Sequence, residues 1–159
     1  MSIRKSICAF LAIAIALLAG ACSSTKSQAP TQITNSKYYL LDPDEEIETP
    51  DPMMRFEKRY HLYGAISRQE QKALEGHYYV FTWSDKERSP ATVRLETRQM
   101  NTGSKVTTRE IDVDRVRRRN HTRFEIIGDE YTIDGKVTAW RVSIVRGGQV
   151  VASDQSYLW

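Results

Sequence analysis

Cys22 has the most distinctive chemical setting in this 159-residue chain. Three small residues, Ala19-Gly20-Ala21, precede it, and the apolar run 7–18 and a basic pair at 4–5 come before them. The apolar run is shorter than the roughly 20 residues that a membrane-spanning helix needs. A positive start, a short apolar segment and small residues before a cleavage point are the three parts of an export signal. The pattern therefore predicts that residues 1–21 are removed and that the exported chain begins with the Cys22 thiol.

The residues around Cys22 resemble the lipobox of bacterial lipoproteins, which usually reads Leu, a small residue, Gly or Ala, and then Cys. Ala19 stands where leucine is usual, with Leu18 one position earlier. The resemblance implies that a diacylglyceryl group is attached to the sulfur of Cys22 and that the signal is cut just before it. Several acyl chains, each contributing about 0.8 kcal/mol per buried CH₂, hold a protein durably on a membrane. We therefore expect membrane attachment through a covalent lipid.

Two other outcomes fit the same signal. Cleavage after Ala21 could leave Cys22 as a free thiol, or the signal could remain as an uncleaved membrane stub. In Gram-negative lipoproteins an aspartate after the cysteine favours retention at the inner membrane, and here that residue is Ser23. The expected location is the cell envelope, and in a Gram-negative organism the outer membrane, facing the periplasm.

Charge, length and cysteine content limit what the exported chain can be. The formal net charge of the whole chain is +3, but residues 1–21 contain two basic residues and no acid, so the processed chain is nearly neutral. A nearly neutral chain gives no compositional support for nucleic-acid binding. Its length, about 140 residues, suits one domain. Removal of Cys8 with the signal leaves Cys22 as the only cysteine, so no internal disulfide is expected and the core must hold the fold.

Residues with catalytic or metal-binding chemistry are few. His61, His77 and His121 are far apart in the sequence and lack the spacing of metal ligands. The chain contains no phosphate-binding loop, no Gly-x-Ser-x-Gly turn and no His-Glu-x-x-His motif. We therefore predict no catalytic residue, no metal ligand and no cofactor.

One basic stretch is a candidate interaction surface for anionic headgroups or a polyanion. It consists of Arg115, Arg117, Arg118 and Arg119. Asp112 and Asp114 lie close by in the sequence, and this mixture of charges favours a solvated loop over a dedicated binding site.

The first part of the exported chain is polar. Residues 22–36 are predicted to be the lipidated cysteine and a flexible tether, because Ser, Thr, Gln, Asn and Lys dominate without an apolar period. Residues 37–53 are predicted to be an extended acidic arm, in which 37–41 is a first strand or a flap. The alternation at 54–62 predicts a strand. Ser67 and Glu70 have capping-box spacing, which predicts a short helix over 68–75.

The following segments alternate between apolar and polar residues as strands do. Tyr79, Phe81 and Trp83 share one face of the strand expected at 77–83, and Trp83 is the expected core anchor. Further strands are expected at 91–100, 105–113 and 123–126.

The C-terminal segment predicts a hairpin over 136–146 and 149–159, because Gly147-Gly148 provides the positive φ angles of a tight turn. Trp140, Val142 and Ile144 form its expected core face. Without a bulge, Arg141 would face Asp154 across the hairpin and form an ion pair. A bulge in the second arm, moving Tyr157 or Leu158 inward, remains open.

Together these strands predict an all-β fold: an antiparallel sandwich of six to eight strands over residues 54–159 with one short connecting helix. The pattern resembles the immunoglobulin-like and fibronectin type III-like domains found on bacterial lipoproteins. Trp83, Tyr131 and the hairpin from Trp140 to Trp159 carry this resemblance. It implies a domain that binds or spaces other proteins, although a fold alone does not assign a function.

Three hypotheses about function follow. The first is a membrane-anchored, non-catalytic β-sandwich that serves interaction or structure in the envelope, with a protein partner. The second is a periplasmic carrier of a hydrophobic ligand, which requires a large internal cavity. The third is an enzyme whose site is assembled in space, which requires a cleft with convergent titratable groups.

Overall fold

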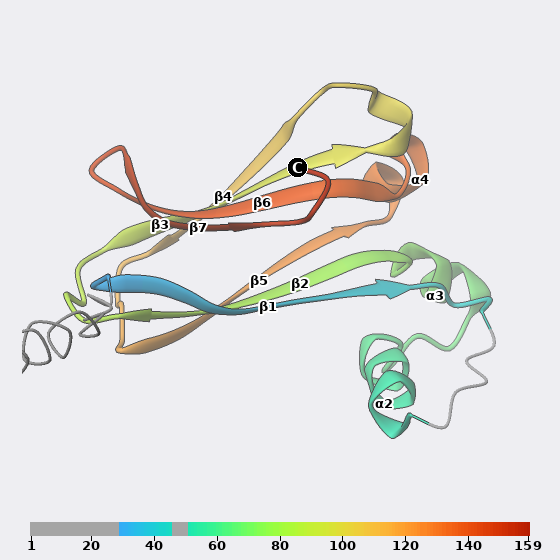
Figure 1. The fold of residues 1–159 in the computed structure, drawn as a ribbon. Helices are drawn as coiled ribbons and strands as arrows, with labels where there is room; N and C mark the ends of the chain where they lie inside the picture. Colours follow the sequence, from blue (N-terminus) through green and yellow to red (C-terminus); the bar gives the residue numbers. More distant parts are fainter. Residues whose placement is uncertain (1–28, 46–50) are drawn as a thin grey trace, which may run out of the picture.

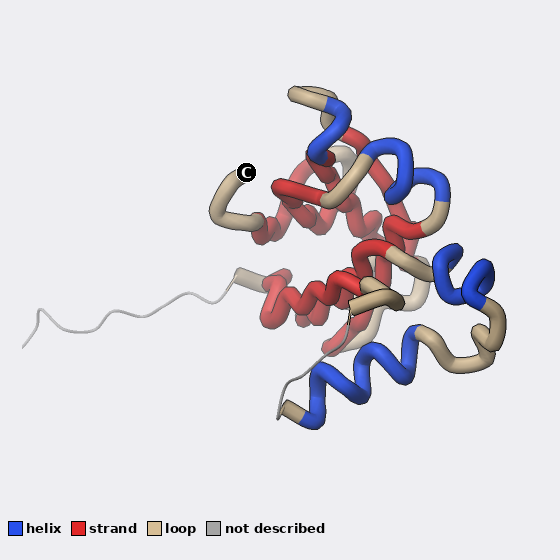
Figure 2. Tube along the Cα trace, turned by 90° about the vertical axis from the view of Figure 1, so that its right-hand side faces the viewer, coloured by secondary structure: helices blue, strands red, loops and turns tan. Residues whose placement is uncertain are grey.

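The computed structural model describes residues 29–45 and 51–159. The expected signal at 1–21, Cys22, most of the expected tether and the middle of the acidic arm lie outside the described residues. The described chain forms two antiparallel sheets stacked face to face, with short helices at one end (Figure 1; Figure 2). None of the helices in the described part is long and apolar enough to cross a bilayer.

The two sheets are built from seven strands. Sheet A has the order β1-β2-β5, with β1 at Thr31–Leu41, β2 at Gly76–Asp85 and β5 at Arg119–Ile127. Sheet B has the order β4-β3-β6-β7, with β4 at Thr107–Val113, β3 at Ala91–Gln99, β6 at Val137–Arg146 and β7 at Gln149–Gln155. The helices are α2 at Pro52–His61, α3 at Arg68–Ala73, α4 at Asp129–Asp134 and the 3₁₀ turn η1 at Met100–Thr102.

This arrangement confirms the predicted all-β antiparallel sandwich. The connections β2–β3, β4–β5 and β5–β6 pass between the sheets, whereas β3–β4 and β6–β7 are hairpins within sheet B. In a constant-type immunoglobulin sandwich the fourth strand pairs with the fifth. Here β4 instead pairs with β3, so three strands face four and β4 is the outer strand of sheet B.

The core lies between the inner faces of the sheets. Every second residue of β3 is buried, and β2 and β6 contribute the large rings of Tyr79, Phe81, Trp83 and Trp140. The predicted role of Trp83 as a core anchor is confirmed: its side chain is 0% exposed, and its Nε1 donates to Thr122 Oγ1 at 3.1 Å. The predicted core face of Trp140, Val142 and Ile144 is confirmed as well.

The start of the fold differs from the prediction. Strand β1 begins at Thr31, within the segment expected to be a tether, and continues through residues 37–41. Its backbone pairs with β2 from Thr31 opposite Asp85 to Leu41 opposite Gly76. The polar composition concealed this strand because an edge strand gains much of its stability from pairing, and only Thr31 and Leu41 at its two ends are buried.

The strand predicted at 54–62 is wrong, because the structure has helix α2 there. Asp51 caps this helix by accepting from the Met53 N–H at 2.9 Å, and Pro52 occupies the first turn. Proline is well suited to that position, where a backbone donor has no helical partner. The predicted helix after Ser67 is confirmed as α3, with both hydrogen bonds of the capping box present.

The hairpin of β6 and β7 contains a bulge that shifts its register. The pairing changes between Ile144 and Val145, so Arg141 faces Gln155 rather than Asp154 and the predicted ion pair is wrong. Arg141 instead binds Glu96 on β3 through two hydrogen bonds of 2.8 and 3.0 Å. The bulge lies in the hairpin's second arm, but Tyr157 and Leu158 stay exposed.

Candidate functional site: the outer face of sheet A

The predicted basic stretch lies at one end of the sandwich. Arg115, Arg117 and Arg118 belong to the connection between β4 and β5, Arg119 begins β5, and all four are exposed. The buried Asn120 shapes this connection. Its Oδ1 accepts from the Arg117 N–H at 2.8 Å, and its Nδ2 donates to the Arg117 carbonyl at 2.7 Å.

The same end holds the start of β1, where the chain arrives from Cys22. The Asp85 N–H donates to the Arg118 carbonyl at 3.1 Å, and the Lys86 N–H donates to the Pro30 carbonyl at 2.9 Å. Backbone hydrogen bonds from the end of β2 therefore hold the basic stretch close to Pro30, near the start of β1. Figure 1 shows this end opposite the one that carries the helices.

Arg146 of β6 binds two acidic residues at this end. The fully buried carboxylate of Asp85 receives hydrogen bonds from Arg146 Nη2 at 2.7 Å and from Thr31 Oγ1 at 3.0 Å. A second nitrogen of Arg146 binds Glu87 at 2.9 Å. Arg146 thus links sheet B to sheet A, while the exposed Asp112 and Asp114 keep negative charge beside the basic stretch.

The basic character continues over the outer face of sheet A. Lys37, Val80 and Arg123 are opposed across the three strands, and Asn35, Thr82 and His121 form the next row. Lys37, Arg119 and Arg123 are exposed, and none of them has an ion-pair partner within the described ranges. The acidic Glu125 is opposed to Tyr78 in the row next to Arg123 on the same face.

Helix α2 lies beneath this face at the other end of the sheet (Figure 1; Figure 2). Its last residue, His61, attaches it. The imidazole stacks on Tyr78 with ring centroids 3.8 Å apart and on Tyr39 at 5.5 Å. Burial lowers the pKa of His61, partly opposed by Glu57 at 3.4 Å. Burial also raises the pKa of the Tyr78 phenol to about 12, so this contact consists of neutral rings at physiological pH.

The rest of α2 projects from the sheet. No residue of the helix is fully buried, and Met53, Phe56 and Tyr60 are 63%, 59% and 50% exposed. The Arg123 guanidinium lies 5.5 Å from the centre of the Tyr60 ring, a cation–π contact between β5 and α2. Between helix and sheet lies a pocket of about 350 Å³. Its lining residues are Tyr60, His61, Tyr63, Leu74, Tyr78, Arg123 and Glu125.

A second cleft, of about 270 Å³, opens between the sheets beside β1 and the C-terminal segment. Tyr38, Tyr79 and Trp140 are among its lining residues, and so is the buried His77. His77 Nε2 accepts from the Val137 N–H at 3.2 Å, which places the proton of the neutral ring on Nδ1. That Nδ1 has no partner. Burial, with a smaller contribution from Lys136, lowers the pKa of His77 to about 4.

The structure does not bring the three histidines together. His61 lies under sheet A, His77 lies inside the sandwich, and His121 contacts Thr82 Oγ1 on the outer face at 3.1 Å. In the part of the chain that the structure describes, no group of three or more His, Cys, Asp and Glu side chains is placed to hold a metal ion.

Sequence reasoning found the basic stretch but missed its neighbours on this surface. The sequence places Arg123 only within the strand expected at 123–126, and it predicts a strand where α2 lies. The signal that could have revealed α2 was Asp51-Pro52, a capping residue followed by proline, ahead of apolar residues at 53, 56 and 60.

The chain matches no protein-family model, no curated protein and no solved structure.

Proposed function

We propose that this protein is a lipid-anchored protein of the cell envelope whose β-sandwich serves interaction or structure rather than catalysis. The observation that carries the proposal is the position of Pro30, which is hydrogen-bonded to the end of β2 beside Arg118. The chain from Cys22 enters the domain there. Lipid attachment would therefore bring the basic end toward the membrane.

The length of the connecting chain limits how far that end can be from the bilayer. Consecutive residues span at most about 3.6 Å each, so Pro30 lies within roughly 29 Å of Cys22. Anionic headgroups attract Lys and Arg with about 1 kcal/mol per residue near the surface. A nearby membrane is therefore a fitting partner for the exposed arginines at 115, 117, 118 and 119.

The non-catalytic part of the proposal is supported by the separation of the three histidines and by the filled core. Trp83, Tyr79 and Phe81 occupy the space between the sheets, where a carrier would hold a large hydrophobic ligand. The cleft at Tyr38 and Trp140 is the place where a carrier would bind its ligand between the sheets. Its volume of about 270 Å³ is slightly smaller than the 300–1,000 Å³ typical of ligand sites.

Replacing the cysteine tests the anchor. We expect Cys22→Ser to abolish incorporation of labelled palmitate and to leave an unlipidated precursor. Cys8→Ser is the matched control, because it removes the other cysteine of the chain and leaves the attachment site intact. Equal labelling of Cys22→Ser and the parent would refute lipid attachment at this residue.

The membrane destination has its own test. In a Gram-negative host, Ser23→Asp should move the protein from the outer-membrane to the inner-membrane fraction on a density gradient. Recovery of the unaltered protein in the inner-membrane fraction alone would contradict the proposed location.

A further inference from the structure

We infer that the outer face of sheet A together with α2 is a membrane-docking face, which lies flat against a bilayer with anionic headgroups. The docking face comprises Lys37, Arg119 and Arg123 of sheet A and Arg55, Arg59, Met53, Phe56 and Tyr60 of α2. This inference goes beyond the lipid anchor, because it concerns folded residues alone and is testable without Cys22.

The first step is charge. The docking face has five exposed cations, two of them on α2, and none has an ion-pair partner in the described part of the chain. The acids on or beside it are Glu57, which contacts His61, Glu125, and Glu45, which lies near Tyr39. The balance is positive over a surface that runs from the start of β5 to the helix, although the processed chain is nearly neutral.

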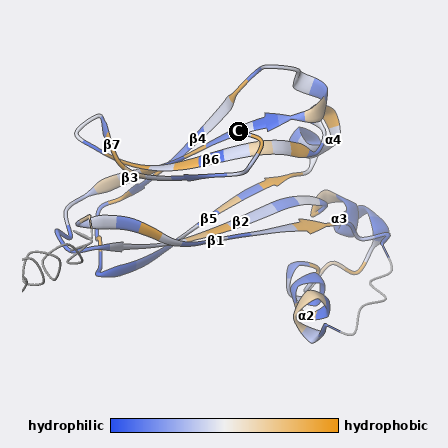
Figure 3. Ribbon diagram, in the orientation of Figure 1, coloured by the Kyte–Doolittle hydropathy of each residue, from blue (hydrophilic) through white to orange (hydrophobic). Residues whose placement is uncertain are grey.

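The second step is the helix. Met53, Phe56 and Tyr60 are spaced three and four residues apart and therefore share one side of α2. The Phe56 and Tyr60 rings are stacked, with centroids 6.1 Å apart. Arg55 and Arg59 on the same helix are exposed as well. In Figure 3 the ribbon of α2 carries both hydrophilic and hydrophobic residues. A helix with an exposed aromatic stripe and basic residues is typical of segments that lie in the membrane interface.

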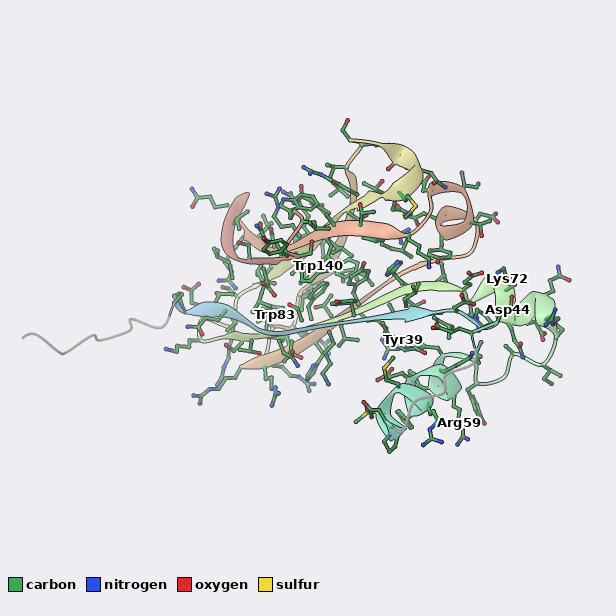
Figure 4. All side chains as sticks on the ribbon, turned by 45° about the vertical axis from the view of Figure 1, so that its right-hand side comes forward. Tyr39, Asp44, Arg59, Lys72, Trp83 and Trp140 are labelled. Atoms are coloured by element: carbon green, nitrogen blue, oxygen red, sulfur yellow. The ribbon has the colours of Figure 1, made fainter. Side chains whose placement is uncertain are left out.

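The third step is the fixed position of the helix. Stacking of His61 on Tyr39 and Tyr78 holds the end of α2 on the sheet, and Arg123 lies over the Tyr60 ring. Figure 4 shows Tyr39 between the sheet and α2, and Arg59 on the far side of the helix. The apolar stripe and the cations of the sheet are thus presented together.

Two features favour a bilayer over an acidic protein as the occupant. The docking face combines distributed cations with apolar side chains that no described segment covers, and a bilayer interface offers both kinds of partner at once. In addition, Pro30 lies beside Arg118, at the end where the face begins. A chain arriving there from a membrane leaves the domain free to lie on this face.

The test uses the processed chain, residues 22–159, with Cys22→Ser, so that any binding comes from the folded domain. The probe is a set of vesicles of phosphatidylcholine with or without phosphatidylglycerol, and the readout is cosedimentation. We expect binding that requires phosphatidylglycerol and weakens with added salt.

Matched variants assign the binding to the face. We expect Lys37→Glu to weaken vesicle binding by about tenfold or more, because it reverses one charge at the surface. Lys105→Glu makes the same charge change on an exposed residue beyond β3 and should alter binding less than about twofold. In the same way, Phe56→Ala should weaken binding several-fold, and Tyr157→Ala, which removes an exposed ring elsewhere, should not.

Several outcomes would overturn the inference. If Lys37→Glu and Lys105→Glu weakened vesicle binding equally, the attraction would depend on the net charge of the protein and not on the docking face. Absence of vesicle binding, or binding only to an acidic protein, would exclude the bilayer as occupant. Either result leaves palmitate labelling at Cys22 untouched, so failure of the docking face is distinguishable from failure of the lipid anchor.

Discussion

The outer faces of the two sheets differ in whether their charged side chains are paired within the protein. On sheet B, Arg94 binds Glu110 at 2.6 Å and Arg141 binds Glu96 at 2.8 Å. The guanidiniums of Arg98 and Arg141 also lie 4.7 and 4.8 Å from the centre of the Trp159 ring. On sheet A, Lys37, Arg119 and Arg123 have no carboxylate partner within the described residues, and Arg123 lies 5.5 Å from the centre of the Tyr60 ring.

We expect this difference in pairing to affect the binding of partners more than the stability of the fold. Exposed ion pairs contribute only about 0.2–1 kcal/mol each, so pairing the charges of sheet B does little to hold the sandwich together. Unpaired charges on sheet A remain available for a partner outside the chain. The inner faces, in contrast, are alike in both sheets, and there we expect the large effects on stability.

The largest effect is expected from the shared core. Trp83→Ala should lower the free energy of unfolding by about 3–5 kcal/mol, because it leaves a cavity between the sheets. Urea denaturation would measure this change. Trp83→Phe, which keeps most of the apolar volume, is the control and should cost less. A Trp83→Ala variant that melts like the parent would mean that the aromatic face of β2 is not the core.

The link between the sheets should come next. Arg146→Ala removes the partner of the fully buried Asp85 carboxylate, and breaking a buried ion pair costs about 3–5 kcal/mol. Because Arg146 retains some exposure to water, we expect about 3 kcal/mol, measured by urea denaturation at neutral pH. Arg94→Ala, on the outer face of sheet B, is the matched control. If both variants lost an equally small part of the free energy of unfolding, Arg146 would not be needed to link the two sheets.

Acid should destabilise the fold through His77. Its pKa is about 4 in the folded state and about 6.5 when unfolded, so the stabilisation is fully present above pH 6.5 and is lost as the pH falls toward 4. The full loss is at most about 3 kcal/mol. The lowered pKa of His61 acts in the same direction.

Urea midpoints of unfolding, measured between pH 4 and pH 6.5, would give the dependence of stability on pH. His77→Gln keeps an acceptor for the Val137 N–H but cannot titrate, so it should flatten the pH dependence. His121→Gln changes an exposed ring on the outer face and is the control. An unchanged slope in His77→Gln would contradict this assignment.

A smaller effect is expected on the outer face of sheet B. Glu96→Gln weakens the two hydrogen bonds from Arg141 and should cost about 0.2–1 kcal/mol. High salt should reduce the difference between variant and parent. A loss of several kcal/mol would show that these pairs are structural and would weaken the contrast between the faces.

The smallest effect on stability is expected from the basic stretch. Arg118→Ala should change the free energy of unfolding by no more than about 0.5 kcal/mol, because only its backbone carbonyl is used in the fold. Thermal melting would test this. A clear destabilisation would make the side chain part of the fold rather than of a surface.

The sequence alone determined the elements whose information is local. The capping box at Ser67 and Glu70 and the Gly147-Gly148 turn each appear where expected, because a few neighbouring residues decide them. The alternation of Ala91, Val93 and Leu95 also marked a buried face correctly. The export signal and Cys22 remain predictions.

Tertiary structure decided what depends on distant partners. Strand β1 extends to Thr31 because β2 supplies its hydrogen bonds, and the register of the last hairpin shifts at a bulge that the two arms accommodate together. Which cations are paired was equally beyond the sequence. Arg141 and Arg123 look alike in the chain, but only the packing of strands places Glu96 beside one and the Tyr60 ring beside the other. Charge pairing is a property of proximity in space, and the order of residues along a β-sandwich does not encode it locally.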